Sequence, residues 1–346
     1  MTSHVLICRL DSDGDVLLAG PAVRAVAARA RRVTLLCGPR GRAAAELLPG
    51  VDEIVEFRCP WIEPEPAPVG RDEIVALAED LRRRAIDVAV VLTSFHQSAL
   101  PTALVLRLAG IATVAAISED YPGSLLDVRH HVADDLHEVE RALSLVATLG
   151  YRLPADDDGG LRVRETASRP VPAEHEPFVV VHPGASVPAR AWSPERNAAL
   201  VDALVAAGRR VVVTGAPGER FLTQLVAGAP RPNVLDLGGQ TDLADLAAVL
   251  AQADAVVVGN TGPAHLAAAV GTPVVSLFAP VVPAVRWRPW RVPHVLLGDQ
   301  HAPCKDTRAR VCPVPGHPCL DSIPVDNVMA AVESLAPAWT LEAFAR

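Results

Sequence analysis

Apolar residues along this chain occur in two patterns, short unbroken runs and longer stretches with helical spacing. The runs are rich in Val, Leu and Ile and contain almost no polar residue, which is typical of parallel strands covered on both faces. The sequence predicts strands over 4–10, 33–37, 53–57, 87–92, 113–117, 178–182, 210–214, 234–236 and 256–258, and a last strand that ends at Phe278.

Between these runs, apolar residues recur every three to four positions and predict amphipathic helices. The expected helices are 16–30, 43–48, 73–84, 98–109, 138–149, 194–207, 219–227, 243–252 and 325–335, with a kink at Pro21 in the first. Such alternation of strand and helix predicts an α/β protein with doubly wound parallel sheets.

The pattern lapses between Asp156 and Pro177, where Asp, Gly, Pro and Glu accumulate without a period. We therefore expect two Rossmann-like domains that face each other across a crevice. Their predicted bounds are 1–165 for the first domain, 166–177 for the linker, 178–325 for the second domain and 326–346 for a helical tail.

Length and charge exclude several classes of protein. A chain of 346 residues is long enough for two domains, and its formal net charge of -8 argues against general nucleic-acid binding, which needs a basic face. Apolar runs are too short to span a bilayer. The start of the chain leads directly into a strand without a signal-like segment, so we expect a cytoplasmic protein. Peripheral contact with the inner membrane surface stays open, because a lipid-linked acceptor would hold the protein there.

Residues 256–278 predict a strand, a tight turn, a short helix and a second strand. Pro263 fits the first turn of that helix, where its missing N–H costs nothing. The helix would begin at the carboxyl end of a strand, and the N–H groups of such a helix start bind phosphates. A purely structural strand–turn–helix is the alternative. His265, one turn into the helix, is either a ligand contact or a packed core histidine.

Two other turns, 183–186 and 214–219, also follow predicted parallel strands and so belong to the same rim of the second sheet. Arg190 lies just beyond the first of them. A guanidinium there can hold diphosphate oxygens with two hydrogen bonds, whereas the simpler alternative is a solvated surface arginine.

In the first domain, Asp15 follows Gly14 after the first strand and opens a helix. Its carboxylate is either a helix N-cap or a general base that faces a crevice. Because Asp11, Ser12 and Asp13 can also cap, we expect at least one of these four side chains to be structural.

Three motifs resemble glycosyltransferase family 9, the ADP-heptose:lipopolysaccharide heptosyltransferases. Residues 9–18, Arg-Leu-Asp-Ser-Asp-Gly-Asp-Val-Leu-Leu, with Pro21 behind them, are similar to the family's opening. Residues 182–186, His-Pro-Gly-Ala-Ser, followed by Arg190 and Trp192, are similar to its second signature. Residues 259–273, Gly-Asn-Thr-Gly-Pro-Ala-His-Leu-Ala-Ala-Ala-Val-Gly-Thr-Pro, are similar to its third and most specific one.

The resemblance implies the GT-B architecture, with the acceptor site mainly in the first domain and the donor site in the second. It implies an inverting, metal-independent glycosyltransferase without a cofactor, which moves a heptose-like sugar from a nucleotide-diphosphate donor, ADP-heptose first, to a glycolipid, polysaccharide or other glycan. Asp15 matches the catalytic base. The positions that match donor contacts are Ser186, Arg190, Glu219, Asn260, Thr261, Gly262 and His265.

The sequence departs from the family pattern at a few positions. Asn260 stands where an aspartate is usual, and the lost carboxylate predicts a different donor sugar rather than none. Ala185 stands where some members carry a hydroxyl. Asp13 adds a charge that would raise the pKa of Asp15 if both carboxylates face the crevice.

Two alternatives remain on the sequence alone: a sugar-nucleotide epimerase of the same build, and an NAD-dependent Rossmann oxidoreductase, which the absence of a clear Gly-x-Gly-x-x-Gly disfavours. A non-catalytic sugar-nucleotide binding module is less favoured still. Cys304, Cys312 and Cys319 resemble a C-terminal feature of part of the family. Their spacing lacks the paired knuckle of structural zinc sites, so zinc, buried thiols and a labile disulfide all remain open.

Overall fold

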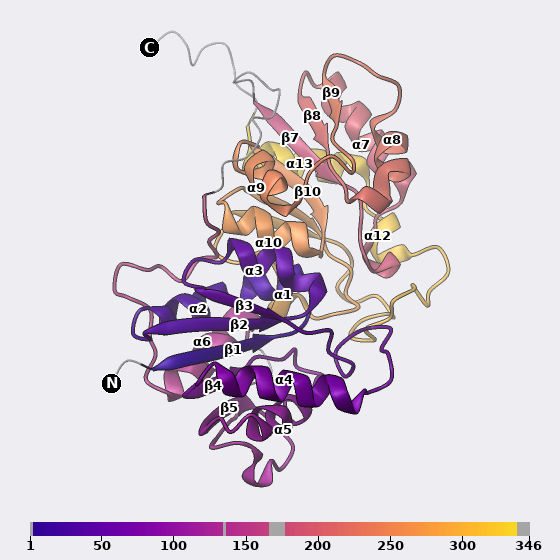
Figure 1. The fold of residues 1–346 in the computed structure, drawn as a ribbon. Helices are drawn as coiled ribbons and strands as arrows, with labels where there is room; N and C mark the ends of the chain where they lie inside the picture. Colours follow the sequence, from indigo (N-terminus) through magenta and orange to yellow (C-terminus); the bar gives the residue numbers. More distant parts are fainter. Residues whose placement is uncertain (1–2, 134–135, 166–176, 338–346) are drawn as a thin grey trace. The chain divides into compact units, whose positions relative to one another are not determined.

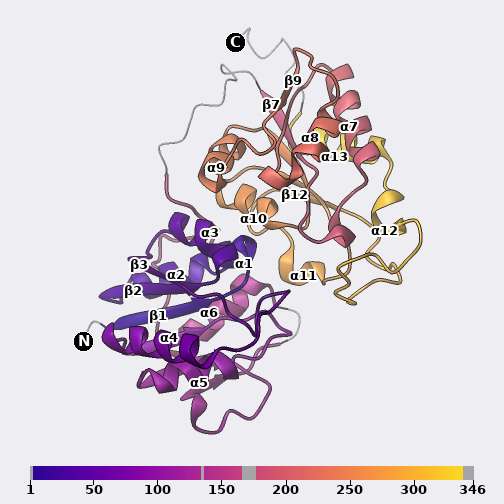
Figure 2. The same cartoon turned by 45° about the vertical axis from the view of Figure 1, so that its right-hand side comes forward.

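The computed structural model describes residues 3–133, 136–165 and 177–337, which form two compact units that divide between Arg164 and Glu165. Each unit is built on a six-stranded sheet whose neighbouring strands all run parallel (Figures 1 and 2). The predicted α/β fold class is confirmed. The linker expected at 166–177 lies outside the described residues except for Pro177.

The sheet of the first unit has the strand order β3-β2-β1-β4-β5-β6. Its strands are β1 (His4–Arg9), β2 (Arg32–Cys37), β3 (Glu53–Glu56), β4 (Val88–Val91), β5 (Thr113–Ile117) and β6 (Val128–His130). Its helices are α1 (Asp13–Leu18), α2 (Gly20–Ala27), α3 (Arg42–Leu47), α4 (Arg71–Arg83), α5 (Leu100–Leu108) and α6 (Glu138–Thr148), with 3-10 turns η1 (Pro39–Gly41) and η2 (Gly123–Leu125).

Helices cover both faces of this sheet (Figure 1). Leu6 and Cys8 of β1 belong to a buried cluster with Leu81 of α4 and Leu106 of α5, all at 0% exposure. Successive side chains of a strand point to opposite faces, so Ile7 packs on the other side of the sheet. Each large apolar side chain that is fully buried stabilises the fold by roughly 1.5–3 kcal/mol.

The helix expected over 16–30 is divided in two. α1 ends at Leu18, and α2 starts at Gly20 with Pro21 in its first turn. Proline lacks the N–H that would continue the preceding helix and its ring collides with the turn before it, so the helix is interrupted at Ala19, which itself keeps helical dihedral angles. Because α1 begins at Asp13, Asp15 lies in its first turn.

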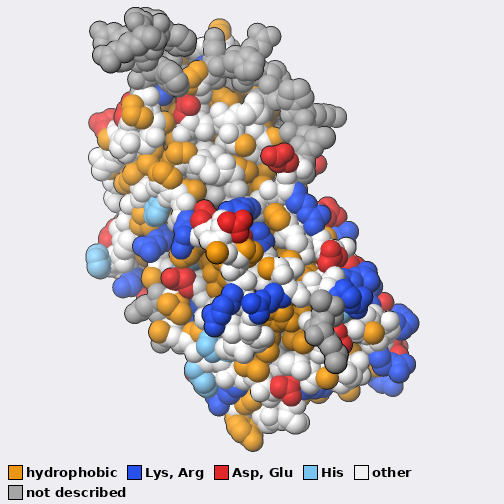
Figure 3. Space-filling view, turned by 90° about the vertical axis from the view of Figure 1, so that its left-hand side faces the viewer, with side chains coloured by type: hydrophobic (Ala, Val, Ile, Leu, Met, Phe, Trp, Pro, Cys, Tyr) orange, Lys and Arg blue, Asp and Glu red, His pale blue; other side chains and the backbone are white. Residues whose placement is uncertain are grey.

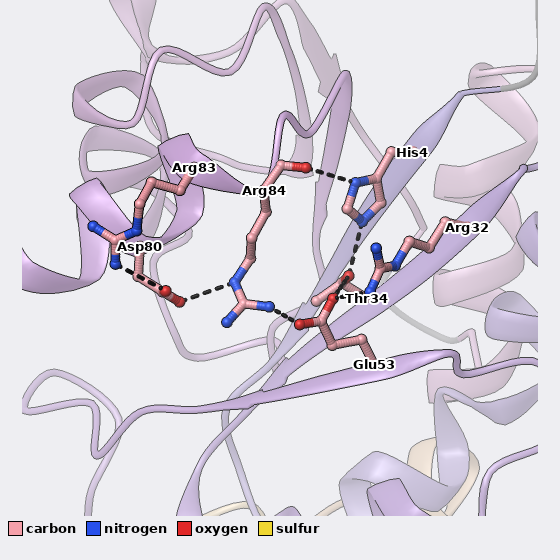
Figure 4. Close-up of polar contacts among 7 residues, drawn as sticks. All are labelled: His4, Arg32, Thr34, Glu53, Asp80, Arg83 and Arg84. Carbon is pink, nitrogen blue, oxygen red and sulfur yellow. Dashed lines mark hydrogen bonds and ion pairs between the residues drawn. The ribbon is translucent and has the colours of Figure 1, made fainter.

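The amino ends of the first three strands carry a polar network (Figure 4). The buried His4 ring contacts the Arg84 carbonyl at 3.0 Å and the Thr34 hydroxyl at 2.8 Å. Glu53 accepts a hydrogen bond from Arg32 at 2.7 Å and also pairs with Arg84. These contacts tie β1, β2 and β3 to the end of α4, so this edge of the sheet is structural, and the candidate chemistry lies at the opposite, carboxyl edge.

The second unit has the order β12-β11-β10-β7-β8-β9. Its strands are β7 (Phe178–His182), β8 (Arg210–Val213), β9 (Val234–Asp236), β10 (Ala255–Gly259), β11 (Val274–Leu277) and β12 (His294–Leu297). Its helices are α7 (Pro194–Ala206), α8 (Arg220–Ala227), α9 (Leu243–Ala251), α10 (Gly262–Ala269), α11 (Ala284–Trp287), α12 (Pro318–Asp321) and α13 (Val325–Leu335), with η3 (Pro188–Arg190) and η4 (Pro217–Glu219). α9 and α10 lie together on one face (Figures 1 and 2), and α7, α8 and α13 contribute to the core on the other.

Both sheets repeat one topology. Numbered within its own unit, each sheet has its first and fourth strands adjacent at the centre and its third and sixth strands at the edges. The strand order therefore reverses between β1 and β4 in the first unit and between β7 and β10 in the second. In open α/β sheets, ligands bind outside the carboxyl ends of the strands at such a reversal.

The sequence pattern missed the sixth strand of each sheet, β6 and β12. Both are edge strands of three or four residues, and their residues are partly exposed or exposed. An edge strand pairs on one side only and need not be apolar on both faces, so it lacks the run that identified the central strands.

The face of the molecule in Figure 3 shows no single chemical character. On the face in Figure 3, basic side chains lie among acidic and apolar ones. Many of the arginines form surface ion pairs, such as Arg42 with Glu46 at 2.8 Å. Within the described residues, no helix is both long and apolar enough to cross a bilayer.

Candidate active site

The rim of the second unit brings two of the three predicted turns together. β7 and β10 are neighbours with His182 opposite Val258, so the turns that follow these strands leave the sheet side by side. A Cβ on Gly259 would lie 2.7 Å from the Arg190 carbonyl oxygen, so the backbones approach closely only because residue 259 is glycine. Nη1 of Arg190 donates a hydrogen bond to the Asn260 carbonyl at 3.4 Å.

Asn260 is buried at 5% exposure and faces the backbone of Ala279, just beyond β11. Its side-chain Nδ2 donates to the Ala279 carbonyl at 3.4 Å, and its Oδ1 accepts the Ala279 N–H at 3.3 Å. A carboxylate can accept here but not donate. The amide thus joins the ends of β10 and β11, which gives the departure from the usual aspartate a structural reason.

We expect Asn260→Asp to lower the free energy of unfolding by about 1–3 kcal/mol, because the new carboxylate faces a carbonyl oxygen and leaves it without a donor. The deficit should shrink at acid pH, where a protonated carboxyl can donate again. Urea unfolding at pH 7.5 and pH 4.5 measures both effects. Asn327→Asp on the exposed side of α13 is the matched control. Equal stability of the two variants at pH 7.5 would show that the Ala279 contact contributes nothing.

The helix start predicted after Asn260 is present. Thr261 is the N-cap of α10 in an extended conformation, and Pro263 lies in the first turn. The Thr261 hydroxyl does not cap the helix and instead donates to the Gly259 carbonyl at 3.5 Å. The first backbone N–H groups of any α-helix, here from Gly262 onward, lack acceptors within the helix. His265 is buried at 5% exposure within this first turn.

The third turn also reaches this rim. Glu219 accepts a hydrogen bond from the Ala216 N–H at 2.8 Å, which folds its carboxylate back over its own turn. That carboxylate lies against the turn after β7, since a Cβ on Gly184 would fall 2.2 Å from its Oε1. Ser186 is exposed two residues further on. The predicted donor residues therefore come from three turns at one edge of the sheet.

His182, at the end of β7, has a structural position. Its ring contacts the Thr214 hydroxyl at 2.9 Å, which links the ends of β7 and β8. Burial lowers the pKa of His182 to about 4. The ring is therefore neutral at physiological pH and contributes no charge to the rim.

In the first unit, Asp15 is held by a buried arginine. Arg9 Nη2 donates to Asp15 Oδ1 at 2.9 Å, and the Ser12 hydroxyl donates to Asp15 Oδ2 at 3.1 Å. The same guanidinium pairs with Asp11 at 3.1 Å and with Glu138 at 3.6 Å. The side chain of Arg9 is 5% exposed and that of Asp15 is 21% exposed. Arg9 and Ser12 therefore fix the orientation of the partly exposed Asp15 carboxylate.

The carboxylates of this cluster stabilise the charged form of Arg9. Although burial alone would lower the pKa of Arg9, the carboxylates of Asp11, Asp15 and Glu138 raise it. Burial raises the pKa of Asp11 to about 6, against the attraction of Arg9, and the charge on Asp15 adds to the rise. Asp11 is therefore the acidic neighbour that interacts with Asp15.

Asp13 has a different contact. Its Oδ1 accepts the Ala44 N–H at 3.0 Å, in the first turn of α3. Burial raises the pKa of Asp13, and the hydrogen bond from Ala44 opposes that rise. Its carboxylate is thus engaged by α3 and does not cap α1, whose N-cap Ser12 makes no side-chain cap hydrogen bond.

Cys304, Cys312 and Cys319 are free thiols. Burial, together with the neighbouring Cys304, raises the pKa of the Cys319 thiol to about 12, so it stays protonated. Within the ranges that the structure describes, no group of three or more His, Cys, Asp or Glu is placed to hold a metal ion.

The sequence did not identify the partners that position Asp15. Ser94, which accepts a hydrogen bond from Arg9 at 2.9 Å, lies 85 residues from Arg9 along the chain. Glu138 lies on α6. Arg9 itself gave one usable signal, a charged residue at the end of an otherwise apolar strand. Such a residue must find acidic partners when it is buried.

Solved structures share this fold. The ADP-heptose lipopolysaccharide heptosyltransferase II of E. coli superposes with a TM-score of 0.72 at 22% identity, over 97% of this chain and 98% of that one. An E. coli heptosyltransferase solved with ADP-2-deoxy-2-fluoro heptose superposes with a TM-score of 0.69 at 22% identity, over 96% and 99%. Two Rossmann-type units in one chain, matched end to end by these structures, define the GT-B architecture.

A family model identifies the family to which this GT-B chain belongs. The model for glycosyltransferase family 9 (heptosyltransferase) matches residues 74–317, so the chain belongs to glycosyltransferase family 9. Among curated proteins, lipopolysaccharide heptosyltransferase 3 of Escherichia coli is 33% identical over 169 residues, which are 47% of this chain and 48% of that protein. The alignment thus spans about half the length of this curated relative. The family match includes the three turns at the rim of the second sheet, whereas Asp15 and Arg9 precede residue 74.

Proposed function

We propose that this protein is an inverting glycosyltransferase in which Asp15 is the general base. It moves a heptose-like sugar from a nucleoside-diphosphate donor, ADP-heptose first, to a hydroxyl of a glycolipid, polysaccharide or other glycan. The observation that carries the proposal is the Asp15 carboxylate, which Arg9 and Ser12 orient at the carboxyl edge of the first sheet in a chain of family 9.

In this mechanism Asp15 accepts the proton of the acceptor hydroxyl as that oxygen attacks the anomeric carbon of the donor. The bond from the anomeric carbon to the diphosphate breaks, and the nucleoside diphosphate leaves with the electron pair. An ionised carboxylate is a hydrogen-bond acceptor only, so it can take the proton of the acceptor hydroxyl. Holding the base in place lowers the entropic cost of reaching the reactive geometry.

The leaving group carries the growing negative charge. Arg190 supplies a guanidinium, Ser186 a hydroxyl, and Thr261 and Gly262 begin the helix whose N-terminus favours anions. His265 and Glu219 complete the proposed donor contacts, with Glu219 on the nucleoside side. With these groups as electrophiles, the scheme uses no metal. Asn260 acts through Ala279 and shapes the rim rather than binding the sugar.

The names of the relatives refer to ADP-heptose and to lipopolysaccharide. By analogy we assign an ADP-sugar donor and a glycan acceptor, and place the protein in the cytoplasm. A lipid-linked acceptor would bring it into peripheral contact with the inner membrane surface.

Thermal unfolding with ADP, GDP, UDP, dTDP, CDP and NAD tests the donor. A ligand at 100 times its Kd stabilises the native state by about 2.7 kcal/mol, so ADP should raise the midpoint clearly. Arg190→Ala should lose most of that rise, whereas Arg231→Ala, at the surface beside Asp202, should keep it. A rise in the unfolding midpoint with GDP or UDP alone would support the transferase proposal but exclude an adenine nucleotide as the donor.

The rival enzymes give different outcomes. A shift with NAD alone would replace the proposal by an oxidoreductase. Conversion of ADP-heptose by the enzyme without any acceptor, into an epimeric sugar nucleotide, would replace it by an epimerase.

A further inference from the structure

The segment 299–321, called the cysteine loop below, lies between β12 and α13 and contains Cys304, Cys312 and Cys319. The proposed function uses none of its residues. Its two ends meet, because the Asp299 N–H donates a hydrogen bond to the Cys319 carbonyl at 3.0 Å. Cys304 and Cys319, at 1% and 0% exposure, belong to the hydrophobic core of the second unit. The loop is therefore closed on itself and anchored in that core.

The middle of the cysteine loop follows the segment that leaves β11. The Asp306 N–H donates to the Pro280 carbonyl at 2.9 Å. The Arg308 N–H donates to the Val281 carbonyl at 2.8 Å. Both acceptors lie just beyond the carboxyl end of β11, so the loop reaches the edge of the sheet that carries the candidate donor turns.

Further along, the cysteine loop contacts η3. The Ala189 N–H donates to the Arg310 carbonyl at 3.0 Å, and the ring nitrogen Nε2 of His317 lies 3.1 Å from the Ala189 carbonyl oxygen. A carbonyl oxygen only accepts hydrogen bonds, so in this contact Nε2 carries the proton and donates it. Both backbone polar groups of Ala189, which is 1% exposed, are thus bonded to the cysteine loop.

Ala189 directly precedes Arg190. Its carbonyl belongs to the same peptide group as the Arg190 N–H, which closes η3 by donating to the Val187 carbonyl at 2.9 Å. On the other side of the residue, the Arg190 carbonyl lies against Gly259. His317 therefore fixes the peptide plane from which the Arg190 side chain starts, and a rotation of that plane would move the guanidinium.

His317 itself has a firm support. It is the N-cap of α12, with a left-handed φ of 45°. Asp321 of this helix accepts the Ser193 N–H at 3.3 Å through Oδ1, and its carbonyl accepts a hydrogen bond from Arg196 at 3.0 Å. These contacts tie α12 to the start of α7, the helix that follows η3. A group that orients another must be held in place itself, and His317 meets this condition.

We propose that His317 is a positioning residue of the donor site. Its ring holds η3 through the Ala189 carbonyl, and so holds Arg190 where that side chain meets the donor diphosphate. The inference rests on the proposed function, which assigns Arg190 to the diphosphate. It gives the cysteine loop a part in donor binding without direct contact with the donor.

Two substitutions separate the hydrogen bond from the backbone conformation. His317→Asn introduces a residue that readily adopts positive φ, but its shorter side chain does not reach the Ala189 carbonyl. His317→Gln can place an amide N–H near the position of Nε2. Calorimetric titration should show the Kd for ADP raised about three- to tenfold in His317→Asn, the factor that corresponds to the loss of one hydrogen bond, and close to wild type in His317→Gln. His301→Asn, exposed on the same loop, is the matched control and should leave the Kd unchanged.

A double-mutant cycle distinguishes positioning from general packing. If His317 acts through Arg190, then adding His317→Asn to Arg190→Ala should change the Kd for ADP by less than about twofold. Amide hydrogen exchange of the peptide 187–193 gives a readout without any ligand. Exchange should be faster in His317→Asn than in the wild type or in His301→Asn, because η3 has lost a contact that holds it closed.

Three results would overturn the inference: wild-type affinity for ADP in His317→Asn, an equal loss of affinity in His317→Gln, or a fully additive loss in the Arg190→Ala background. If the wild type itself binds no ADP, the donor assignment fails, and hydrogen exchange then decides on His317 alone. Unchanged exchange of 187–193 would remove His317 as the support of η3, whereas faster exchange would retain it. The failure of the donor assignment and the failure of this inference therefore give different results.

Discussion

Replacing Asp15 by asparagine is expected to lower kcat for sugar transfer by about 10²–10⁴-fold, the usual contribution of a general base. Asparagine keeps the size of the side chain and an oxygen for the Arg9 hydrogen bond, but it cannot take the proton of the acceptor hydroxyl. Donor binding is assigned to the second unit, so the Kd for ADP should stay near its wild-type value. Initial rates with saturating donor, and calorimetric titration with ADP, separate the two effects.

Asp72→Asn is the matched control, because this carboxylate is 95% exposed on α4 and pairs only with the neighbouring Arg71 in the contacts observed. Its rate should equal that of the wild type. Wild-type turnover in Asp15→Asn would instead remove Asp15 from the mechanism, and the base would have to be sought elsewhere in the chain.

Arg9→Met should have the largest effect on stability. The substitution leaves the buried carboxyl of Asp11 without its cation and leaves Glu138 with Arg141 alone. Breaking a buried ion pair from one side costs about 3–5 kcal/mol. Arg9 lowers the pKa of Asp11, so its loss raises that pKa above the present value of about 6. The native variant then binds more protons than the wild type, and its deficit should grow as the pH rises from 5 to 8.

Urea unfolding across this pH range measures the deficit. Arg42→Met removes an exposed i,i+4 pair with Glu46 and should cost less than about 1 kcal/mol at every pH. Arg9→Lys keeps the charge without the fork of donors, so it should recover part of the stability but not the orientation of Asp15, which kcat reports. A pH-independent deficit in Arg9→Met would show that the carboxyls do not depend on Arg9. If that variant does not fold, Arg9→Lys carries the test through its lower kcat.

The central strands were predictable because they are apolar on both faces, as the 0% exposure of Val5 and Val180 illustrates. The edge strands β6 and β12 were not, since partly exposed segments such as Val128–His130 need no apolar run. The helix start after Asn260 was predictable, because proline is favoured in the first turn of a helix and Pro263 marks that turn.

Side-chain partners across the fold could not be read from the sequence. The contacts of Asn260 with Ala279, and of Asp13 with Ala44, depend on how strands and turns approach one another in space. Charge alone suggested that Asp13 would act on Asp15. In the structure Asp13 accepts a hydrogen bond from a backbone N–H, whereas Asp11 and Asp15 pair with the same guanidinium, that of Arg9. Asp11 and Asp13 lie only two residues apart, so the sequence could not show which of them contacts Arg9.

The repeated strand order has a consequence for how such chains diversify. All strands of one sheet come from residues before Arg164 and all strands of the other from residues after Glu165, so a crossover at this boundary separates no paired strands. Each half therefore inherits a complete sheet and its own carboxyl-edge turns. Under the proposed function, exchange of coding segments between relatives at this point would recombine the proposed donor and acceptor preferences, while each hydrophobic core passes intact to the recombinant.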